Sequence, residues 1–195
     1  MKRLLDIILS LLGLIVLLPF LFFFSILIIM DSGFPVFYKQ TRVGRHNRDF
    51  KIIKFRTMVQ DADKKGLLLS TSNDPRISDI GTLLRKYKID ELPQLFNVLI
   101  GDMSLVGPRP EVRKYVDLFP IEYDHILTVR PGITDYAAIE YKDENAILEK
   151  VANKEEVYIK QILPQKIIYY MKYIKDMSLA TDMKLIFKTI LEILK

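Results

Sequence analysis

Two adjacent carboxylates, Asp90 and Glu91, begin the densest group of reactive residues in the chain. The apolar pattern that follows predicts a helix over residues 91–100, with Asp90 as its N-cap. A helix N-terminus offers unpaired N–H groups and the positive end of a dipole, so it binds phosphate and keeps a carboxylate ionised. An ionised carboxylate can act as a nucleophile or as a Mg²⁺ ligand. Taken alone, an Asp-Glu pair at this position is more often a plain cap.

Cationic residues could surround this acidic pair. The turn Pro108-Arg109-Pro110 holds one guanidinium between two rigid residues, and the planar fork of arginine suits phosphate oxygens. Lys54 and Arg56 lie two apart on a predicted strand and therefore share a face. Three further arginines lie in turns or in a short basic segment: Arg76, Arg85 and Arg130. Each alone is most often structural, but together they suit a diphosphate substrate bound with Mg²⁺.

Other chemistries have little support in the sequence. The chain has no cysteine, so it can form neither a disulfide nor a thiolate nucleophile. His46 and His125 stand alone, without the spacing of metal ligands. The sequence contains no Gly-x-Ser-x-Gly, no Walker loop and no Gly-x-Gly-x-x-Gly. Both histidines are therefore interpreted as surface or satisfied interior residues.

An apolar segment precedes all of these residues. Residues 7–30 carry no charge, and as one straight helix they would extend ~36 Å, enough to span a bilayer. Pro19, near the middle, predicts a sharp bend that leaves each half ~18 Å long. Basic residues flank both ends, and a re-entrant helix keeps both flanks on the cytoplasmic side. We therefore favour a re-entrant helix over a spanning one, and both over a signal peptide, because no cleavage site follows.

The charge distribution points to a membrane surface. The 195-residue chain has a net charge of +5, and residues 1–56 hold nine basic against three acidic residues. The basic excess thus lies beside the apolar segment, which suits anionic lipid. A single-strand nucleic-acid binder that uses an aromatic hairpin is a competing interpretation. Because few nucleic-acid readers begin with a membrane segment, we expect the bilayer as a partner and no nucleic acid.

The remaining patterns predict a helix-rich α+β domain with a small sheet. Residues 35–40 and 50–57 form a hairpin around a polar turn at 44–49. Short helices are expected over 82–88, 111–119, 146–152 and 155–173, and a loop over 61–79. Thr181 should cap a last, basic amphipathic helix, which either packs on the domain or lies on the membrane. We assign residues 1–34 to a membrane anchor and residues 35–195 to a cytosolic catalytic domain with amphipathic surface helices.

The sequence resembles the bacterial sugar transferases, the small monotopic phosphoglycosyl transferases. The resemblance covers essentially the whole chain, and its longest ungapped part runs from residue 90 to residue 110. The matching stretches are Lys54-Phe55-Arg56-Thr57-Met58, Asp74-Pro75-Arg76, Ile89-Asp90-Glu91-Leu92-Pro93-Gln94-Leu95, Asn97-Val98-Leu99, Gly101-Asp102-Met103-Ser104-Leu105-Val106-Gly107-Pro108-Arg109-Pro110 and Arg130-Pro131-Gly132-Ile133-Thr134.

The resemblance implies a specific reaction and location. Members have a re-entrant helix broken by proline, lie on the cytoplasmic face of the bacterial inner membrane and need Mg²⁺. They transfer a sugar phosphate from a UDP-sugar to undecaprenyl phosphate and release UMP by a ping-pong mechanism. Asp90 matches the nucleophile that forms a covalent phosphosugar, Glu91 matches a residue of metal binding or proton handling, and Arg109 matches a phosphate-binding turn. The product starts a glycoconjugate, so downstream glycosyltransferases are expected partners.

Two departures from the family pattern matter. Leu18 stands where relatives often have serine before the helix-breaking proline, so the bend rests on Pro19 alone. Residues 135–140 replace a common Gly-Leu-Ala-Gln continuation, and if this loop touches the nucleotide sugar, the sugar specificity cannot be copied from a relative. The alternative to an enzyme is a non-catalytic membrane-surface adaptor, against which the intact Asp90, Glu91 and Arg109 argue. The transferred sugar, the pathway and the oligomeric state are left open by the sequence.

Overall fold

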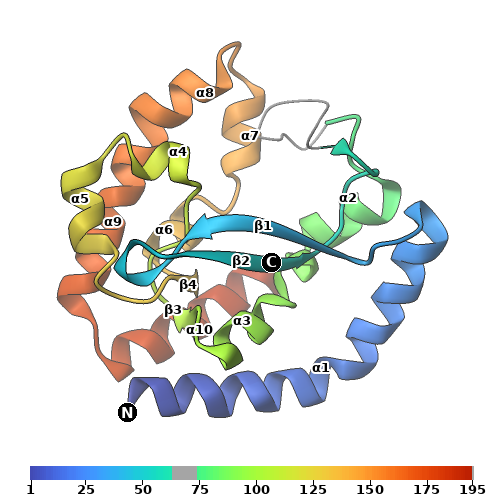
Figure 1. Ribbon diagram of the computed structural model, residues 1–195, viewed down its shortest axis with the longest axis horizontal. Helices are drawn as coiled ribbons and strands as arrows, with labels where there is room; N and C mark the ends of the chain where they lie inside the picture. Colours follow the sequence, from blue (N-terminus) through green and yellow to red (C-terminus); the bar gives the residue numbers. More distant parts are fainter. Residues whose placement is uncertain (63–73, 195) are drawn as a thin grey trace.

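A computed structural model describes residues 1–62 and 74–194. The chain begins with the long helix α1, Lys2–Ser32, which contains Pro19 and changes direction near its middle (Figure 1). By length and composition it is able to cross a membrane. Leu14, Leu21 and Ile28 form a buried stripe on one face and pack against the domain, while most other large side chains of α1 are exposed and apolar. The predicted bend is present, and the outer face of the helix is apolar.

The predicted hairpin is confirmed. Strands β1, Phe37–Val43, and β2, Asp49–Phe55, pair antiparallel around the short turn η1, Arg45–Asn47. Asn47 adopts a left-handed backbone with φ 59°, which asparagine tolerates well in a turn. A second sheet was not predicted from the sequence. It joins β3, Ser104–Val106, in parallel with β4, Gly132–Thr134.

The Asp90 region differs from its prediction. Helix α2, Asp79–Lys86, is followed by a 3-10 turn, η3, Ile89–Glu91, and α3 begins only at Gln94 and runs to Ile100. Asp90 therefore lies inside the turn and does not cap a helix, so the N-cap prediction is wrong. Pro93 precedes the helix because proline has no N–H to give and fits where a helix starts. The predicted end at Gly101 is confirmed by its left-handed φ of 101°.

The second half of the chain is helical and forms the main core. The short helices are α4, Arg113–Val116; α5, Pro120–Ile126; α6, Tyr136–Glu140; α7, Glu144–Glu149; and α8, Lys154–Val157. A π-helical segment, η4, Tyr158–Ile162, continues into α9, Leu163–Asp176. Buried tyrosines such as Tyr123, Tyr158 and Tyr170 fill the core around α9. The helix expected over 155–173 is thus divided among α8, η4 and α9, and α5 and α6 are additional elements.

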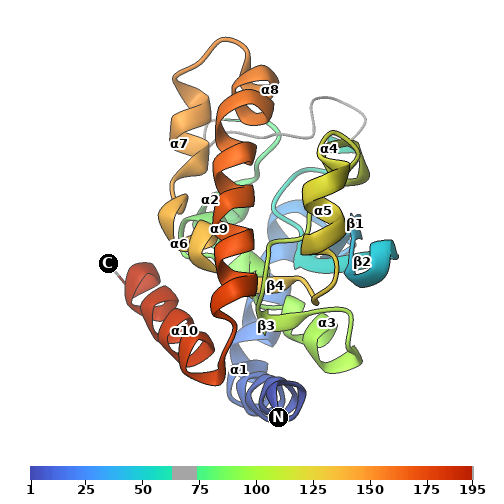
Figure 2. The same cartoon turned by 90° about the vertical axis from the view of Figure 1, so that its left-hand side faces the viewer.

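The last helix, α10, runs over Leu179–Leu194 and begins earlier than predicted. Ser178 caps it by accepting the N–H of Thr181, so Thr181 is not the cap. Leu185 is buried against the domain, whereas Phe187 and Leu191 are 64% and 44% exposed. Figure 2 shows α10 and the start of α1 at the same end of the molecule, below α9. Of the loop predicted over 61–79, residues 63–73 lie outside the described residues.

Candidate active site

A cavity of about 1460 Å³ lies between the first part of the domain and its later helices. One wall comes from β2, α2 and η3, and the other from α6, α7 and α10. Seven of the residues singled out in the sequence line it: Lys54, Arg56, Arg76, Arg85, Asp90, Glu91 and Arg109. Pro108, Pro110 and Arg130 are not part of this lining. The fold therefore gathers most of the predicted site from segments that are up to 55 residues apart.

Glu91 is paired with two cations of the cavity. Arg109 donates two hydrogen bonds to its carboxylate, with Nη1 at 3.0 Å from Oε2 and Nη2 bonded to Oε1. Lys54 Nζ donates to the same Oε1 at 2.9 Å. Burial opposes ionisation, but Arg109 and Lys54 hold the pKa of Glu91 well below its usual range. Glu91 is thus a fixed anion that orients two cations.

Asp90, its neighbour, has the opposite environment. The side chain is buried, with 8% of its surface exposed, yet no hydrogen bond to its carboxylate is found among the described residues. Burial raises the pKa of Asp90, and the nearby Lys54 ammonium partly counteracts this by lowering it. A buried carboxylate without donors is poorly solvated, which makes its oxygens available to an electrophile or a cation.

Arg109 is held by the second sheet. The N–H of Gly107 donates to Thr134 O at 3.0 Å, and the N–H of Gly132 donates to Pro108 O at 3.0 Å. A Cβ on Gly132 would lie 2.0 Å from Gly107 N, so only glycine permits this approach. The two motifs Gly-Pro-Arg-Pro and Arg-Pro-Gly, which the sequence analysis treated separately, are therefore one structural unit.

The other predicted cations have different hydrogen-bond partners. Arg85 donates to Thr57 Oγ1 at 2.8 Å, and Arg76 pairs with Asp74 at 2.6 Å. Arg56 donates to the carbonyl of Ser32 at 2.8 Å, at the end of α1. Although Lys54 and Arg56 were predicted to act on one face, they therefore serve different parts of the molecule.

Arg130 points away from the cavity. Its Nε donates at 2.9 Å to Gly101 O, just after the C-terminal end of α3. The guanidinium of Arg3 binds the same helix end through Val98 O and Leu99 O, at 2.6 and 2.9 Å. Cations at this position satisfy carbonyls that the helix leaves unpaired. The structure thus assigns Arg130 a capping contact and places it outside the proposed phosphate-binding group.

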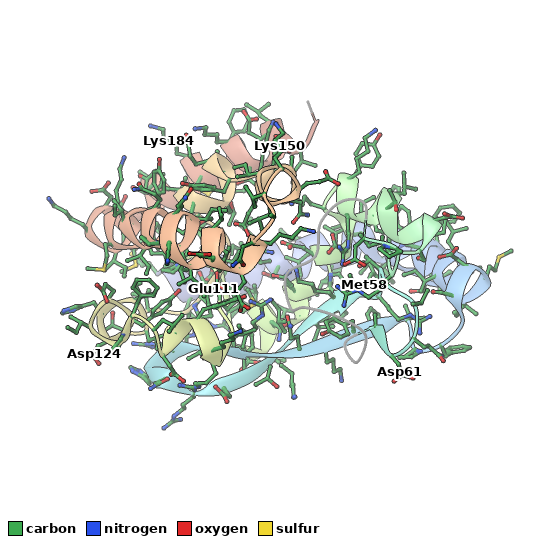
Figure 3. The ribbon with its side chains drawn as sticks, turned by 90° about the horizontal axis from the view of Figure 1, so that it is seen from above. Met58, Asp61, Glu111, Asp124, Lys150 and Lys184 are labelled. Carbon is green, nitrogen blue, oxygen red and sulfur yellow. The ribbon has the colours of Figure 1, made fainter. Side chains whose placement is uncertain are left out.

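A largely buried charge cluster, in which Arg42, Glu144 and Lys166 also line the cavity, was missed from the sequence. Lys166 on α9 lies against Glu111, Glu144 and Tyr158, and Arg42 Nη1 is 3.5 Å from Glu111. Figure 3 shows Glu111 among the helices near the centre of the molecule, whereas Asp124 and Lys184 lie at its edge. Arg42 also donates to Pro110 O at 3.1 Å, so this cluster supports the turn that carries Arg109. Glu111 directly follows that turn, but no sequence signal indicates its distant partner Lys166.

The residues present fit a Mg²⁺ ion best at Asp90. Among residues 1–62 and 74–194, no group of three or more acidic or histidine side chains is found. Magnesium is commonly held by one or two carboxylates together with substrate phosphates, so a single free carboxylate is sufficient. Both oxygens of Glu91 already accept hydrogen bonds from cations, which disfavour a metal ion there. The geometry thus favours Asp90 over Glu91 as the ligand.

Comparison with known proteins defines the family. The Bacterial sugar transferase family model matches residues 1–195, so the chain belongs to this family. A UDP-N-acetylgalactosamine-undecaprenyl-phosphate N-acetylgalactosaminephosphotransferase of Aeromonas hydrophila is 40% identical over 99% of this chain and 43% of its own length. The exopolysaccharide production protein PSS of Rhizobium leguminosarum bv. phaseoli is 38% identical over 97% of this chain and 93% of its own.

A third relative has a different sugar in its name. The UDP-glucose:undecaprenyl-phosphate glucose-1-phosphate transferase of Escherichia coli (strain K12) is 33% identical over 97% of this chain and 39% of its own length. The chain thus spans less than half of the Aeromonas and Escherichia proteins but most of the Rhizobium protein.

Proposed function

We propose that this chain transfers a sugar 1-phosphate from a UDP-sugar to undecaprenyl phosphate and releases UMP. The observation that carries the proposal is the buried Asp90 carboxylate, which has no hydrogen-bond donor among the described residues and faces a cavity lined by cations. The names of the Aeromonas and Escherichia relatives contain both a UDP-sugar and undecaprenyl phosphate, which supports the substrate classes. An adaptor would have no need of an unpaired buried carboxylate.

The reaction proceeds in two displacements. An Asp90 oxygen attacks the phosphorus that bears the sugar, the bond from this phosphorus to the bridging oxygen breaks, and UMP leaves with that oxygen. An oxygen of the lipid phosphate then attacks the same phosphorus and displaces Asp90, which leaves a sugar diphospho-lipid. A covalent intermediate divides one difficult transfer into two easier steps. Asp90 must be ionised at the start of the first step.

The neighbours of Asp90 stabilise the charge of the reacting phosphate. Arg109 and Lys54 are fixed by Glu91 before substrate binds, so their N–H groups need no reorientation as charge develops. Arg85 and Arg76 line the adjacent part of the cavity and suit the second phosphate. When bound, Mg²⁺ would neutralise part of the diphosphate charge, with Asp90 as its protein ligand.

We further propose that α1 is re-entrant and that the domain lies on the cytoplasmic face of the inner membrane. Both ends of α1 contact the same domain. At the start, Lys2 binds Asp182 at 2.6 Å and Asp6 accepts the hydroxyl of Ser104 at 2.9 Å, while at the end Arg56 binds Ser32. A straight spanning helix would separate these ends by the thickness of the bilayer. In this arrangement the exposed apolar side of α10 rests on the lipid surface.

The reaction is tested with purified protein and a panel of UDP-sugars, beginning with UDP-N-acetylgalactosamine. Without lipid phosphate, we expect about one UMP per protein and transfer of radiolabelled sugar phosphate to the protein. Addition of undecaprenyl phosphate should then move the label to lipid. UMP release that requires the lipid from the first turnover would contradict the covalent intermediate, and no release from any UDP-sugar would contradict the proposed function.

The topology is tested in the naturally cysteine-free chain. Single cysteines are placed after Met1 and, separately, at Asn47 in the hairpin turn, and intact cells are treated with a membrane-impermeant thiol reagent. Both sites should be protected. Labelling of the N-terminal cysteine alone would mean that α1 spans the membrane.

A further inference from the structure

The cavity has a second group of polar residues, which the proposed phosphate chemistry does not use. Glu144 begins α7 and lines the cavity wall opposite the phosphate-binding cations, together with Lys166 from α9. Glu144 and Arg109 line the same cavity. This wall therefore borders the space in which a phosphate at Arg109, and the group attached to that phosphate, would bind.

Lys166 fixes the orientation of Glu144. Its ammonium donates to Glu144 Oε2 at 3.1 Å, to Glu111 Oε1 at 3.3 Å and to the hydroxyl of Tyr158 at 3.1 Å, which uses all three of its protons. Lys166 is buried, with 4% of its surface exposed. An ammonium in this position has no freedom to turn away, so Glu144 is held in place before any ligand binds.

The second oxygen of Glu144 is available to a ligand. Its Oε1 accepts no hydrogen bond from any residue within 1–62 and 74–194, and 23% of the side chain is exposed. The neighbouring part of α6 presents the small side chains of Ala137 and Ala138 to the cavity, which leaves room beside the carboxylate. A fixed acceptor in an open space suits a donor group of the ligand, and a hydroxyl bound to a carboxylate makes a strong hydrogen bond.

Charge divides the ligand between the two walls. Lys166 on this wall is already paired with Glu144, whereas Arg85 and Arg109 lie on the other side of the cavity, so the anionic part of a UDP-sugar belongs near these two arginines. The group beside Glu144 must be neutral and rich in donors. A sugar ring attached directly to the reacting phosphorus has this character and this position.

We propose, on the basis of the proposed function, that Glu144 accepts hydroxyl hydrogen bonds from the sugar of the donor substrate, with Lys166 as its positioning residue. Glu144 then contributes to the choice of sugar. The uridine end of the donor lies outside its reach. A ring hydroxyl that is absent or inverted leaves the fixed carboxylate unpaired, which is how a polar site rejects a near-identical substrate.

The test is Glu144→Gln, which keeps the shape of the side chain and removes its charge. We expect the KM for the preferred UDP-sugar to rise about tenfold or more, as for loss of one hydrogen bond to a charged group. The inhibition constant of UMP, which has no sugar ring to bind, should change less than about twofold. Deoxy analogues of the preferred UDP-sugar identify the hydroxyl, because the analogue that lacks it should be used almost equally by parent and variant.

Glu149→Gln is the matched control, because Glu149 is exposed on the same helix and lies outside the cavity lining. It should leave the KM for the UDP-sugar and the inhibition constant of UMP unchanged. Parallel weakening of UMP and UDP-sugar binding in Glu144→Gln would place Glu144 at the uridine and overturn the proposal, as would an unchanged KM. A parent protein that releases UMP from no UDP-sugar would instead contradict the proposed function itself.

Lys166→Arg separates positioning from folding. Arginine keeps the buried positive charge but cannot place three hydrogen bonds with the same geometry, so the KM for the UDP-sugar should rise while UMP inhibition is kept. Equal weakening of UDP-sugar binding and UMP binding, with a lowered melting temperature, would mean that Lys166 is structural only.

Discussion

Two clusters of buried charge lie in this domain, and they differ in how completely their hydrogen bonds are made. Around Lys166, the ammonium uses all three protons, and Glu111 receives bonds from both Lys166 and Tyr158. Around Glu91, the carboxylate is equally well bonded, but Asp90 beside it has no donor among the described residues. The fully bonded pair of Lys166 and Glu111 stabilises an arrangement, whereas the unbonded carboxylate of Asp90 costs free energy that only a ligand or a reaction recovers.

Asp90→Asn tests the proposed reactive carboxylate and should have the largest effect. An amide is neutral and not nucleophilic, so UMP release should fall about 10³-fold or more. The melting temperature should be unchanged or higher, because a buried charge without donors has been removed. UMP release and protein labelling are measured together. Retention of more than a few per cent of the rate would remove Asp90 from the role of nucleophile.

Arg109→Ala tests whether the paired side of the Glu91 cluster also contributes to the reaction. Loss of the guanidinium removes preorganised donors, and turnover should fall about 10²–10³-fold. Arg109→Lys keeps the charge and loses only the fork, so it should lose less. Steady-state rates of both variants are compared at equal folded protein. Equal, negligible effects would make Arg109 a turn residue.

Lys166→Met should change stability more than chemistry. Removing one partner of a buried ion pair typically costs about 3–5 kcal/mol of unfolding free energy, and the loss here should lie at or below this range because Glu111 keeps Arg42 and the hydroxyl of Tyr158 as partners. Thermal unfolding in detergent measures this loss, which should exceed that of Lys142→Met, whose ion pair with Glu192 lies at the surface. A stability change no larger than that of the surface pair would mean that the interior cluster is not structural.

Lys54→Met should lower activity more strongly at acid pH than at alkaline pH. Burial raises the pKa of Asp90 and Lys54 lowers it, so removing Lys54 raises it further. The ionised form is the active one, and activity is therefore lost as the pH falls through this pKa. The acid limb of the pH–rate profile should move to higher pH in Lys54→Met and stay in place in Lys54→Arg. An unmoved limb would mean that Lys54 does not act on Asp90.

The sequence predicted the parts of the site that are local or rigid. Asp90 and Glu91 are adjacent, and Arg109 is confined by its prolines, so residue type and spacing were sufficient to single them out. The contacts of Arg56 and Arg130 were not predicted, because their partners are carbonyls at or just beyond helix ends 23–29 residues away in the chain. An arginine that binds a helix end has no signature of its own in the sequence. Their roles became visible only with the positions of α1 and α3.

Other residues could not be predicted because folding determines their environment. A lysine in a helical pattern is expected at the surface. Lys166 is nevertheless buried, and its hydrogen-bond acceptors lie 8–55 residues away in the chain. The pairing of Gly107 with Gly132 likewise depends on two short strands that are too brief to give a periodic pattern. The last helix was predicted well, because its apolar stripe extends over four turns.

The contact between Lys2 and Asp182 joins residues 180 positions apart, and this has a consequence for how the protein is made. At about 5–20 residues per second, a ribosome needs roughly 8–30 s to proceed from Ser32, the end of α1, to Asp182. In the proposed re-entrant topology, the start of α1 meets lipid during this interval, before its partner on α10 exists. Retention of the N-terminus in the cytosol would then depend on the positive charges of Lys2 and Arg3 themselves. The same two side chains would thus act first as a topological signal during synthesis. In the folded protein they then attach the start of α1 to α10 and α3.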